Sequence, residues 1–510
     1  MTPVRVEGAT NDRAARQIAL VYDARMALFR CVLAMAVMTG VACGGAQRKP
    51  PPDGTSVIFT KTYAGSVNRN VDVLFLIDDS SSMKLTQDKF LRDFPTFMTG
   101  LQGTQGLPNL HLAVISQDMG AGDGSITGCD TTGGKQGIFQ YAARGTCTAT
   151  NLDPGATYIA DIAGVRNYTG NAADVFKCIA ALGEAGCGFE SQFASLLRAL
   201  GADGRAAPAE NQGFLRPDAY LAIIMLTNED DCSATPGVPL FDTGSNSTIQ
   251  SQLGPPGNFR CNEFGHDCDG AHPARFAPNN DVTTTVTYNS CSSNDSEGYL
   301  LGATDTANRI KALKNDPSQI AVVAIQAPAT PYTVNWKNPS PLDTSCGAAS
   351  CPWPVIAHSC AASDGSFGDP GVRTAQLVRE FGAHGVVLPI CVDSFASSLD
   401  RAAMLINSLL SPPCIPGRVQ QNATETPDCK VTRHVATGTG SFTDKVVPSC
   451  ADNGGVAPCW QLTVGGAGCE TGQILDVSAD PNVSPTTATN ITVSCALCQA
   501  GVSDFEKGCP

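Results

Sequence analysis

The chain has 510 residues, with 33 Lys and Arg against 47 Asp and Glu, and its formal net charge is −14. This acidic balance argues against binding to nucleic acid, because neutralising phosphates requires a concentrated cationic surface. Hydrophobic residues make up 42 %, which argues against a disordered chain. The 22 cysteines predict an exported protein that folds in an oxidising compartment.

Residues 1–42 have the pattern of a signal peptide, with Met26 as an alternative start of translation. Their apolar run, Cys31 to Met38, is too short to span a membrane. Small residues follow it and end at Cys43, which resembles the processing site of bacterial lipoproteins and implies that Cys43 is lipidated. Ordinary signal cleavage is the alternative, because Gly40 stands where such sites usually have Leu.

Residues 43–56 are polar, include three consecutive prolines and predict an extended tether. From Val71 onward, predicted strands and helices alternate, which indicates an α/β fold with a doubly wound, mostly parallel sheet. Apolar runs of strand length predict buried strands at Val71–Ile77, Leu110–Ser116, Ala219–Thr227, Ile320–Ile325 and Gly385–Ile390. Helical periodicity predicts helices over residues 90–101, 174–183, 189–201, 299–314, 373–384 and 394–410.

The composition changes near residue 412 and divides the chain into two predicted parts. Residues 57–411 carry the alternating strands and helices. Residues 412–510 hold eight cysteines and short Thr- and Val-rich runs without a helical period, which predicts a small, disulfide-bonded, β-rich module or an extension packed on the first domain. Two long insertions, at 232–297 and 328–372, follow strands at their carboxyl ends. We therefore expect both insertions near any site formed there.

The first buried strand ends in Asp78-x-Ser80-x-Ser82, which places one carboxylate and two hydroxyls around a single point. Such hard oxygen ligands suit Mg²⁺ or Mn²⁺ better than zinc. This turn resembles the metal-ion-dependent adhesion site (MIDAS) of von Willebrand factor type A (vWA) domains. The resemblance covers residues 57–412 through the order of strands and helices. It implies a strand order of 3-2-1-4-5-6, with the metal between strands one and four, where open α/β sheets bind ligands.

The resemblance also implies a Thr ligand before the helix that leads into strand four, and an Asp ligand after that strand. The first loop contains no Thr, so Glu190 or Ser191 takes its place. Asn228 stands at the position of the Asp. Asp78 and Glu190 together with neutral Asn228 still provide two carboxylates. In the alternative interpretation, the turn only caps the following helix and binds no metal.

Two other groups of residues have alternative interpretations. The run Glu229-Asp230-Asp231 is either a second cation site or, as we expect, a solvated acidic loop. Residues 261–272 contain two Cys and two His at a spacing that zinc accepts, and residues 495–498 have the Cys-x2-Cys spacing of a redox pair. Disulfides are expected instead, because exported cysteines usually pair. The expected local disulfides are Cys129 with Cys147 and Cys178 with Cys187.

The chain has no Gly-x-Ser-x-Gly elbow, no His-Glu-x-x-His motif and only six histidines, so we expect no enzyme. We expect instead a cell-envelope lipoprotein whose vWA-like domain binds a macromolecular partner. A bound Mg²⁺ or Mn²⁺ would leave one coordination position for a carboxylate of that partner. The alternative is a metal-free structural or assembly protein of the envelope. The expected metal ligands are Asp78, Ser80, Ser82, Glu190 and Asn228.

Overall fold

The computed structural model describes residues 56–498 and Cys509, with gaps at 65–68, 104–105, 122–127, 132, 242–251, 255–258, 338–352, 411–413, 423–425, 439–440, 465–468, 470–471, 479, 481 and 484–488. The predicted signal peptide, Cys43 and nearly all of the predicted tether lie outside these residues. Within the described part of the chain, no helix is long and apolar enough to cross a membrane.

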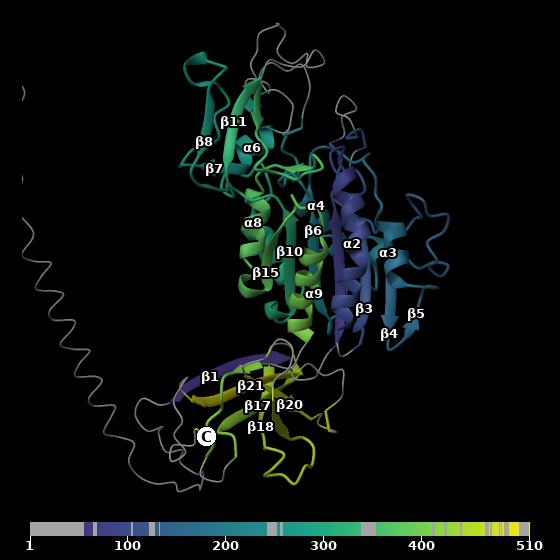
Figure 1. The fold of residues 1–510 in the computed structure, drawn as a ribbon, viewed down its shortest axis with the longest axis vertical. Helices are drawn as coiled ribbons and strands as arrows, with labels where there is room; N and C mark the ends of the chain where they lie inside the picture. The colour runs from purple at the N-terminus through teal and green to yellow at the C-terminus, as the bar shows by residue number, and fades with distance from the viewer. Residues whose placement is uncertain are drawn as a thin grey trace, which may run out of the picture. The chain divides into compact units, whose positions relative to one another are not determined.

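A seven-stranded mixed sheet forms the centre of the α/β part (Figure 1). Its first five strands in space are parallel to one another and are the five that the apolar runs predict. The last two run antiparallel at one edge. In spatial order the strands are β15 (Gly385–Pro389), β10 (Ile320–Gln326), β6 (Tyr220–Leu226), β2 (Asn70–Ile77), β3 (Asn109–Ser116), β4 (Ile159–Ile162) and β5 (Val165–Arg166).

The order of these strands agrees with the order that the vWA resemblance implies. With β2 as strand one, the sheet reads 3-2-1-4-5-6 across β4, β3, β2, β6, β10 and β15, and β5 adds a further edge strand. β2 and β6 are therefore neighbours although about 140 residues separate them in the chain. Their carboxyl ends place Asp78 and Thr227 side by side at one edge of the sheet.

Helices pack on both faces of the sheet because the side chains of β2 alternate between two cores. Phe75 faces the first core, where its ring lies 5.0–5.8 Å from the rings of Phe90, Phe94, Phe97 and Phe176. Helices α2 (Lys84–Gln102), α3 (Ala172–Ala180) and α9 (Ala396–Leu410) cover that core. Helices α4 (Gln192–Leu200), α7 (Ala303–Lys311) and α8 (Val372–Arg379) cover the second.

The two insertions pair with each other. In one small antiparallel sheet, β8 of the first insertion joins β11 of the second, with Val286 opposite Val334. A buried apolar cluster that includes Tyr332 and Trp336 supports this sheet. The elements of the insertions are α6 (Phe259–Gly265), β7 (His266–Cys268), β8 (Thr285–Tyr288), β9 (Cys291–Ser293), β11 (Tyr332–Lys337), β12 (Trp353–Ile356), β13 (Cys360–Ala361) and β14 (Phe367–Gly368).

The C-terminal residues form two antiparallel sheets around an apolar core that includes Trp460 and Leu475. β1, at the start of the described chain, belongs to this region: it lies beside β21, with Thr62 Oγ1 2.7 Å from Thr492 Oγ1. One sheet therefore holds the first and the last strand of the described chain. The strands are β1 (Ser56–Ala64), β16 (Cys414–Pro416), β17 (Cys429–Gly438), β18 (Ser441–Val447), β19 (Trp460–Val464), β20 (Gly472–Val477) and β21 (Thr489–Cys498).

Both predicted local disulfides are wrong. Cys129 pairs with Cys187, and Cys147 pairs with Cys178. The reason is spatial: the loop before α4 lies against the segment after β3, and Gln117 donates a hydrogen bond to the Cys187 carbonyl across this contact. The other disulfides among the described residues are 232–261, 268–291, 360–391, 414–469, 429–495, 450–459 and 498–509.

Candidate cation and partner-binding site

Asp78 lies at the carboxyl end of β2 and is fully buried. Its Oδ1 accepts hydrogen bonds from the backbone N–H of Ser80 at 2.9 Å and from Gln117 Nε2 at 3.2 Å. Its Oδ2 accepts one from the Thr227 hydroxyl at 2.9 Å. Burial raises the pKa of Asp78, and the hydrogen bonds from Ser80 and Thr227 partly offset this effect. One backbone N–H and two side chains, which follow three neighbouring strands, thus fix this carboxylate.

Ser80, Ser82 and Asn228 bring neutral oxygens to the same place. Ser80 Oγ lies 3.3 Å from Ser82 Oγ, and Ser82 Oγ lies 3.2 Å from Asn228 Oδ1. The residue at the N-cap of α2 is Met83, and no side chain caps the helix there. The two serine hydroxyls contact each other and Asn228 and do not cap the helix, whereas Asp78 does accept a hydrogen bond from the Ser80 backbone N–H.

Glu190 is the second buried carboxylate of the site, with 2 % of its surface exposed. Its Oε1 is buried and has no hydrogen-bond partner. The pKa of Glu190 is raised well above its usual value, first by burial and then by the negative charges of Glu229 and Asp78. A cation between these carboxylates would lower the pKa of Glu190 again, because its positive charge stabilises the ionised form.

Of the two candidates for the missing Thr, the geometry favours Glu190 over Ser191. The Ser191 hydroxyl donates to the carbonyl of Phe189 at 3.2 Å, whereas Glu190 Oε1 has no partner. Gln117 holds this loop beside Asp78, because its Oε1 accepts a hydrogen bond from the Ser191 backbone N–H at 3.3 Å while its Nε2 donates to Asp78.

Asp79 is the neighbour of Asp78 but takes a different role. Its Oδ1 accepts a 2.6 Å hydrogen bond from the Ser116 hydroxyl, and its Oδ2 forms an ion pair with Lys135. Gly186 approaches it so closely that a Cβ there would lie 2.4 Å from Asp79 Oδ1. Asp79 thus anchors the loop before α4 through packing and paired charge.

The residues present fit a hard divalent cation with few anionic ligands. Asp78 and Glu190 supply two carboxylates, and the hydroxyls of Ser80 and Ser82 and the amide of Asn228 supply neutral oxygens, a ligand type that Mg²⁺ and Mn²⁺ accept. No group of three or more His, Cys, Asp or Glu that would bind a metal occurs among the described residues. A cation here would therefore depend on the neutral oxygens and on the unpartnered oxygen of Glu190.

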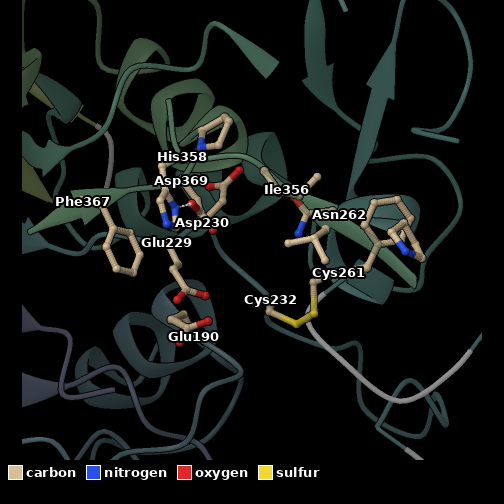
Figure 2. A pocket seen from close by; sticks show the side chains of 14 residues that line it. Glu190, Glu229, Asp230, Cys232, Cys261, Asn262, Ile356, His358, Phe367 and Asp369 are labelled. Carbon is tan, nitrogen blue, oxygen red and sulfur yellow. Dashed lines mark hydrogen bonds and ion pairs between the residues drawn. A yellow bond between two sulfur atoms is a disulfide. The ribbon is translucent and has the colours of Figure 1, made fainter. Parts of the chain in front are cut away.

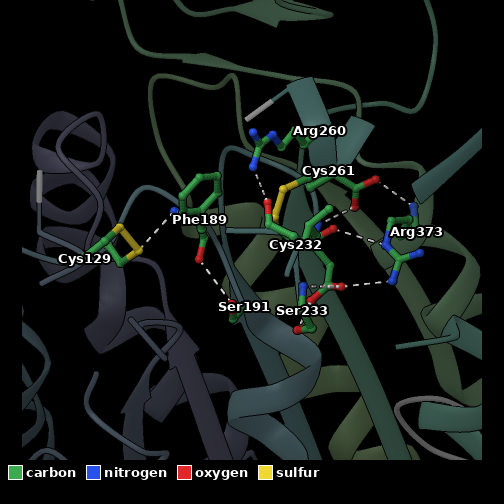
Figure 3. The surroundings of a disulfide bond; sticks show 12 residues. Cys129, Phe189, Ser191, Cys232, Ser233, Arg260, Cys261 and Arg373 are labelled. Carbon is green, nitrogen blue, oxygen red and sulfur yellow. Dashed lines mark hydrogen bonds and ion pairs between the residues drawn. A yellow bond between two sulfur atoms is a disulfide. The ribbon is translucent and has the colours of Figure 1, made fainter. Parts of the chain in front are cut away.

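The expectation of a solvated loop at Glu229-Asp230-Asp231 is wrong for the two aspartates. Asp230 Oδ2 accepts hydrogen bonds from His266 Nε2 at 2.9 Å and from backbone N–H groups at the start of α8. Burial alone would raise the pKa of Asp230, but His266 and these amides lower it to about 2. Asp231 pairs with buried Arg373. Figure 3 shows Arg373 on the side of the Cys232–Cys261 disulfide. Their bonds are satisfied within the protein, so the aspartates form no second cation site.

The cysteine motifs are disulfides, as expected. Within residues 261–272, Cys261 pairs with Cys232 and Cys268 pairs with Cys291, so neither sulfur is available to zinc. Within residues 495–498, the two cysteines pair with different partners, Cys429 and Cys509. The nine disulfides of the described residues indicate a chain that folds in an oxidising compartment.

A pocket of about 250 Å³ opens beside Glu190 (Figure 2). Both insertions contribute to it, as expected from their positions after the carboxyl ends of strands. Figure 2 shows the carboxyl groups of Glu190 and Glu229 facing each other at one side of the pocket. The lining residues are Glu190, Glu229, Asp230, Cys232, Phe259, Cys261, Asn262, Pro354, Val355, Ile356, His358, Phe367, Asp369 and Pro370.

Two residues of this region, Gln117 and Thr227, are not predicted by the sequence as part of the site, and a third, Glu229, is predicted only as part of an acidic run. Gln117 and Thr227 both donate to Asp78, and Glu229 faces Glu190. Gln117 follows directly on a predicted strand and Thr227 is the last residue of another, and that position is the signal that would have indicated them. The sequence indicates Glu229 only as part of the acidic run Glu229-Asp230-Asp231, and its place opposite Glu190 depends on how the insertions fold.

No protein-family model matches the chain, and no curated protein matches it. Solved structures similar to it include a von Willebrand factor type A protein from Catenulispora acidiphila, with 10 % identity, a TM-score of 0.27 and coverage of 88 % of this chain and 62 % of that chain. The vWF domain of the type V pili tip protein Mfa5 from Porphyromonas gingivalis has 13 % identity and a TM-score of 0.30, and the match covers 69 % of this chain and 99 % of that chain. The pilus adhesin RrgA from Streptococcus pneumoniae has 9 % identity and a TM-score of 0.26, and the match covers 87 % of this chain and 59 % of that chain.

The chain thus spans less than two thirds of the length of the Catenulispora protein and of RrgA. At these identities and TM-scores the similarities carry no argument about ligands. The vWA-like fold is supported here by the strand order of the central sheet and by the place of Asp78 at the end of its first strand.

Proposed function

We propose that the α/β domain binds a macromolecular partner through a divalent cation, Mg²⁺ or Mn²⁺, and that a carboxylate of the partner completes the coordination of this ion. The cation supplies the positive charge that joins two acidic surfaces. For this chain, with its net charge of −14, such a bridge offsets the repulsion that an acidic partner would meet. The proposed ligands are Asp78, Ser80, Ser82, Glu190 and Asn228.

The observation that carries this proposal is the unpartnered Oε1 of Glu190. The Glu190 carboxyl group forms a hydrogen bond with Glu229, but its Oε1 is unsatisfied. A buried charge in this setting costs several kcal/mol unless the group takes a proton or meets a cation. Glu190 lies beside a second buried carboxylate, Asp78, so one dication offsets both charges. Neutral Asn228 leaves more of the ion's charge for the incoming carboxylate than an Asp would.

The proposal places this binding domain at the cell envelope of a bacterium. The predicted signal peptide and Cys43 supply export and a lipid anchor, and the disulfides agree with an oxidising compartment. In this role the chain is a binding protein and not an enzyme.

A second candidate is a metal-free structural or assembly protein of the envelope. It is favoured by one observation: both oxygens of Asp78 already accept hydrogen bonds within the protein. In that case Glu190 would remain protonated, and the site would hold the loops together without a cation.

A small carboxylate probe distinguishes the two candidates. We expect N-acetylglutamate methylamide to bind the mature, disulfide-bonded chain in Mg²⁺ with a dissociation constant in the millimolar range, about −4 kcal/mol or weaker. The isosteric N-acetylglutamine methylamide should not bind, and EDTA should abolish binding of the glutamate probe. Asp305→Asn is the control variant, because this carboxylate is exposed on α7 and pairs only across one helical turn with Arg309. Equal binding of the glutamate probe in Mg²⁺ and in EDTA would favour the metal-free protein.

A further inference from the structure

Strand β18 of the C-terminal region has a free edge (Figure 1). On one side it pairs with β17, in a register that runs without a break from Val447 to Phe442. Among the described residues, no strand pairs with its other side. A regular strand with unpaired backbone N–H and C=O groups is a template for another strand, and native proteins usually shorten, bend or cover such an edge. The edge of β18 is therefore a candidate interaction surface.

The side chains of this strand are exposed, and two of them are large and apolar. All five residues from 442 to 446 are exposed, so neither face of this part of the strand is covered. Phe442 has 52 % and Val446 has 65 % of its surface exposed. Both stand on one face, with Asp444 midway between them, because side chains alternate along a strand. The order on this face, apolar, acidic and apolar, is symmetric about Asp444.

A second copy of the chain is the occupant that fits this symmetric order. A two-fold axis perpendicular to the sheet pairs two β18 strands antiparallel and keeps each face on its own side. Directly opposite residues point to the same face, so the axis passes through a residue and not between two residues. With the axis at Asp444, Phe442 of each copy lies opposite Val446 of the other. With the axis one residue to either side, an apolar side chain lies opposite Asp444 instead.

The unfavourable contact in this pairing is between the two copies of Asp444. Like charges that lie directly opposite each other are destabilising. Two features reduce this cost. Asp444 Oδ1 already lies 2.7 Å from His434 Nδ1 on β17, and 64 % of the Asp444 side chain is exposed, so water and salt screen the charge. The apolar pairs on both sides of Asp444 therefore decide the register.

We propose that two copies of the chain associate through β18, antiparallel about Asp444, so that their four-stranded sheets join into one sheet of eight strands. The contact between two strand edges is small, so we expect association that is reversible and rises with concentration. β18 contains none of the proposed cation ligands, and the inference therefore stands apart from the proposed function. A dimer presents two α/β domains, which strengthens binding to a repetitive partner.

Sedimentation of the mature, disulfide-bonded chain in EDTA tests the association. We expect the average mass to rise from monomer towards dimer as the concentration increases. The double variant Phe442→Thr, Val446→Thr should weaken association at least tenfold, and Thr keeps the strand because it is a good β-former. Val456→Thr is the control, because Val456 is 65 % exposed but lies outside β18. A chain that stays monomeric at every concentration, or equal association of both variants, would overturn the proposal.

A cysteine at position 444 tests the register. In the proposed pairing, residue 444 of one copy lies opposite residue 444 of the other, with Cα atoms about 4.5–5.5 Å apart. This distance lies within the range of about 4.4–6.8 Å that a disulfide spans. Asp444→Cys should therefore give a dimer linked through residue 444 under mild oxidation, as located by peptide mapping.

Thr443→Cys is the control for this cross-link. Its two copies are offset along the strands and lie more than about 7 Å apart, too far for a disulfide. Failure of Asp444→Cys to cross-link while the chain is folded, as judged by circular dichroism, would overturn the proposal. Efficient cross-linking of Thr443→Cys would overturn it as well, because the two strands would then pair in a different register.

Discussion

Asp231 Oδ2 and Arg373 Nη2 lie 3.1 Å apart in an ion pair in which neither side chain is exposed to solvent. Arg373 Nε also donates to the Asp231 carbonyl at 3.1 Å, so the guanidinium ties the segment after β6 to the first turn of α8. Asn228 and Glu229 lie in the same short segment. The pair therefore fixes the part of the chain that faces both the cation site and the pocket.

Breaking this pair from one side should destabilise the protein strongly. Arg373→Met leaves the Asp231 carboxylate buried without its partner, and we expect a loss of about 3–5 kcal/mol in the free energy of unfolding. Denaturant unfolding of the disulfide-bonded chain measures it. Arg309→Met, which removes an exposed pair on α7, is the control and should cost less than about 1 kcal/mol. Similar losses for the two variants would contradict the assigned role of the buried pair.

Asn228→Asp should tighten binding of Mn²⁺, because a third carboxylate adds attraction to a dication. We expect a gain of about tenfold, equivalent to about 1.4 kcal/mol. The same variant should weaken binding of the glutamate probe, since the ion's charge is then more fully neutralised. Calorimetric titration of both ligands measures the two effects, and a variant that strengthens or weakens both together would be inconsistent with the proposed division of charge.

Peptide mapping of the unreduced protein should find Cys129 linked to Cys187 and Cys147 linked to Cys178. The first bridge holds the loop that carries Glu190. Replacing Cys129 and Cys187 together by Ser should cost about 2–4 kcal/mol of stability and also weaken Mn²⁺ binding, because the loop loses its restraint. Replacing Cys450 and Cys459, a bridge of the C-terminal region, should leave Mn²⁺ affinity unchanged. Recovery of a peptide that links Cys129 to Cys147 would refute this arrangement.

His111 makes stability depend on pH. It lies on β3 with Nδ1 2.8 Å from the Phe214 carbonyl, and burial lowers its pKa to about 4. As pH falls from about 6.5 towards 4, the unfolded chain binds this proton before the folded chain does, so stability is lost.

His111→Gln should remove about 1–2 kcal/mol of that loss, less than the whole shift because solvent screens part of the charge. Asp72, whose pKa burial raises to about 6, acts in the opposite direction but is present in both proteins. Asp72 Oδ1 lies 3.5 Å from His111 Nδ1, so the difference between the two unfolding profiles from pH 7 to pH 4 reports His111 together with its effect on Asp72. Parallel profiles would show that His111 does not titrate as described.

The sequence predicts the five parallel strands well, because strands buried on both faces need unbroken apolar runs such as Val71–Ile77. It also places Asp78, since a polar turn that ends such a strand must lie at an edge of the sheet. Both features depend on short stretches of sequence, an apolar run and the polar turn that follows it, so the sequence alone predicts them.

The rest depends on contacts between loops far apart in sequence. Asp230 and Asp231 look like a solvated acidic turn until α8 and Arg373 are placed against them. Cys187 takes Cys129 rather than a cysteine nearer in sequence because of how two loops meet. Glu229 belongs to the pocket only through the folds of both insertions. None of these contacts leaves a periodic pattern in the sequence.

Titration of Mn²⁺ into the mature, disulfide-bonded chain and into Glu190→Gln and Ser191→Ala tests the central claim most directly. The account predicts one saturable site in the unmodified chain, an affinity that falls at least tenfold in Glu190→Gln, and little change in Ser191→Ala. A loss of Mn²⁺ affinity confined to Ser191→Ala would show that Ser191 and not Glu190 is the ligand. Negligible heats for all three proteins, with their folds intact, would contradict the account, because the Asp78 turn would then hold no cation.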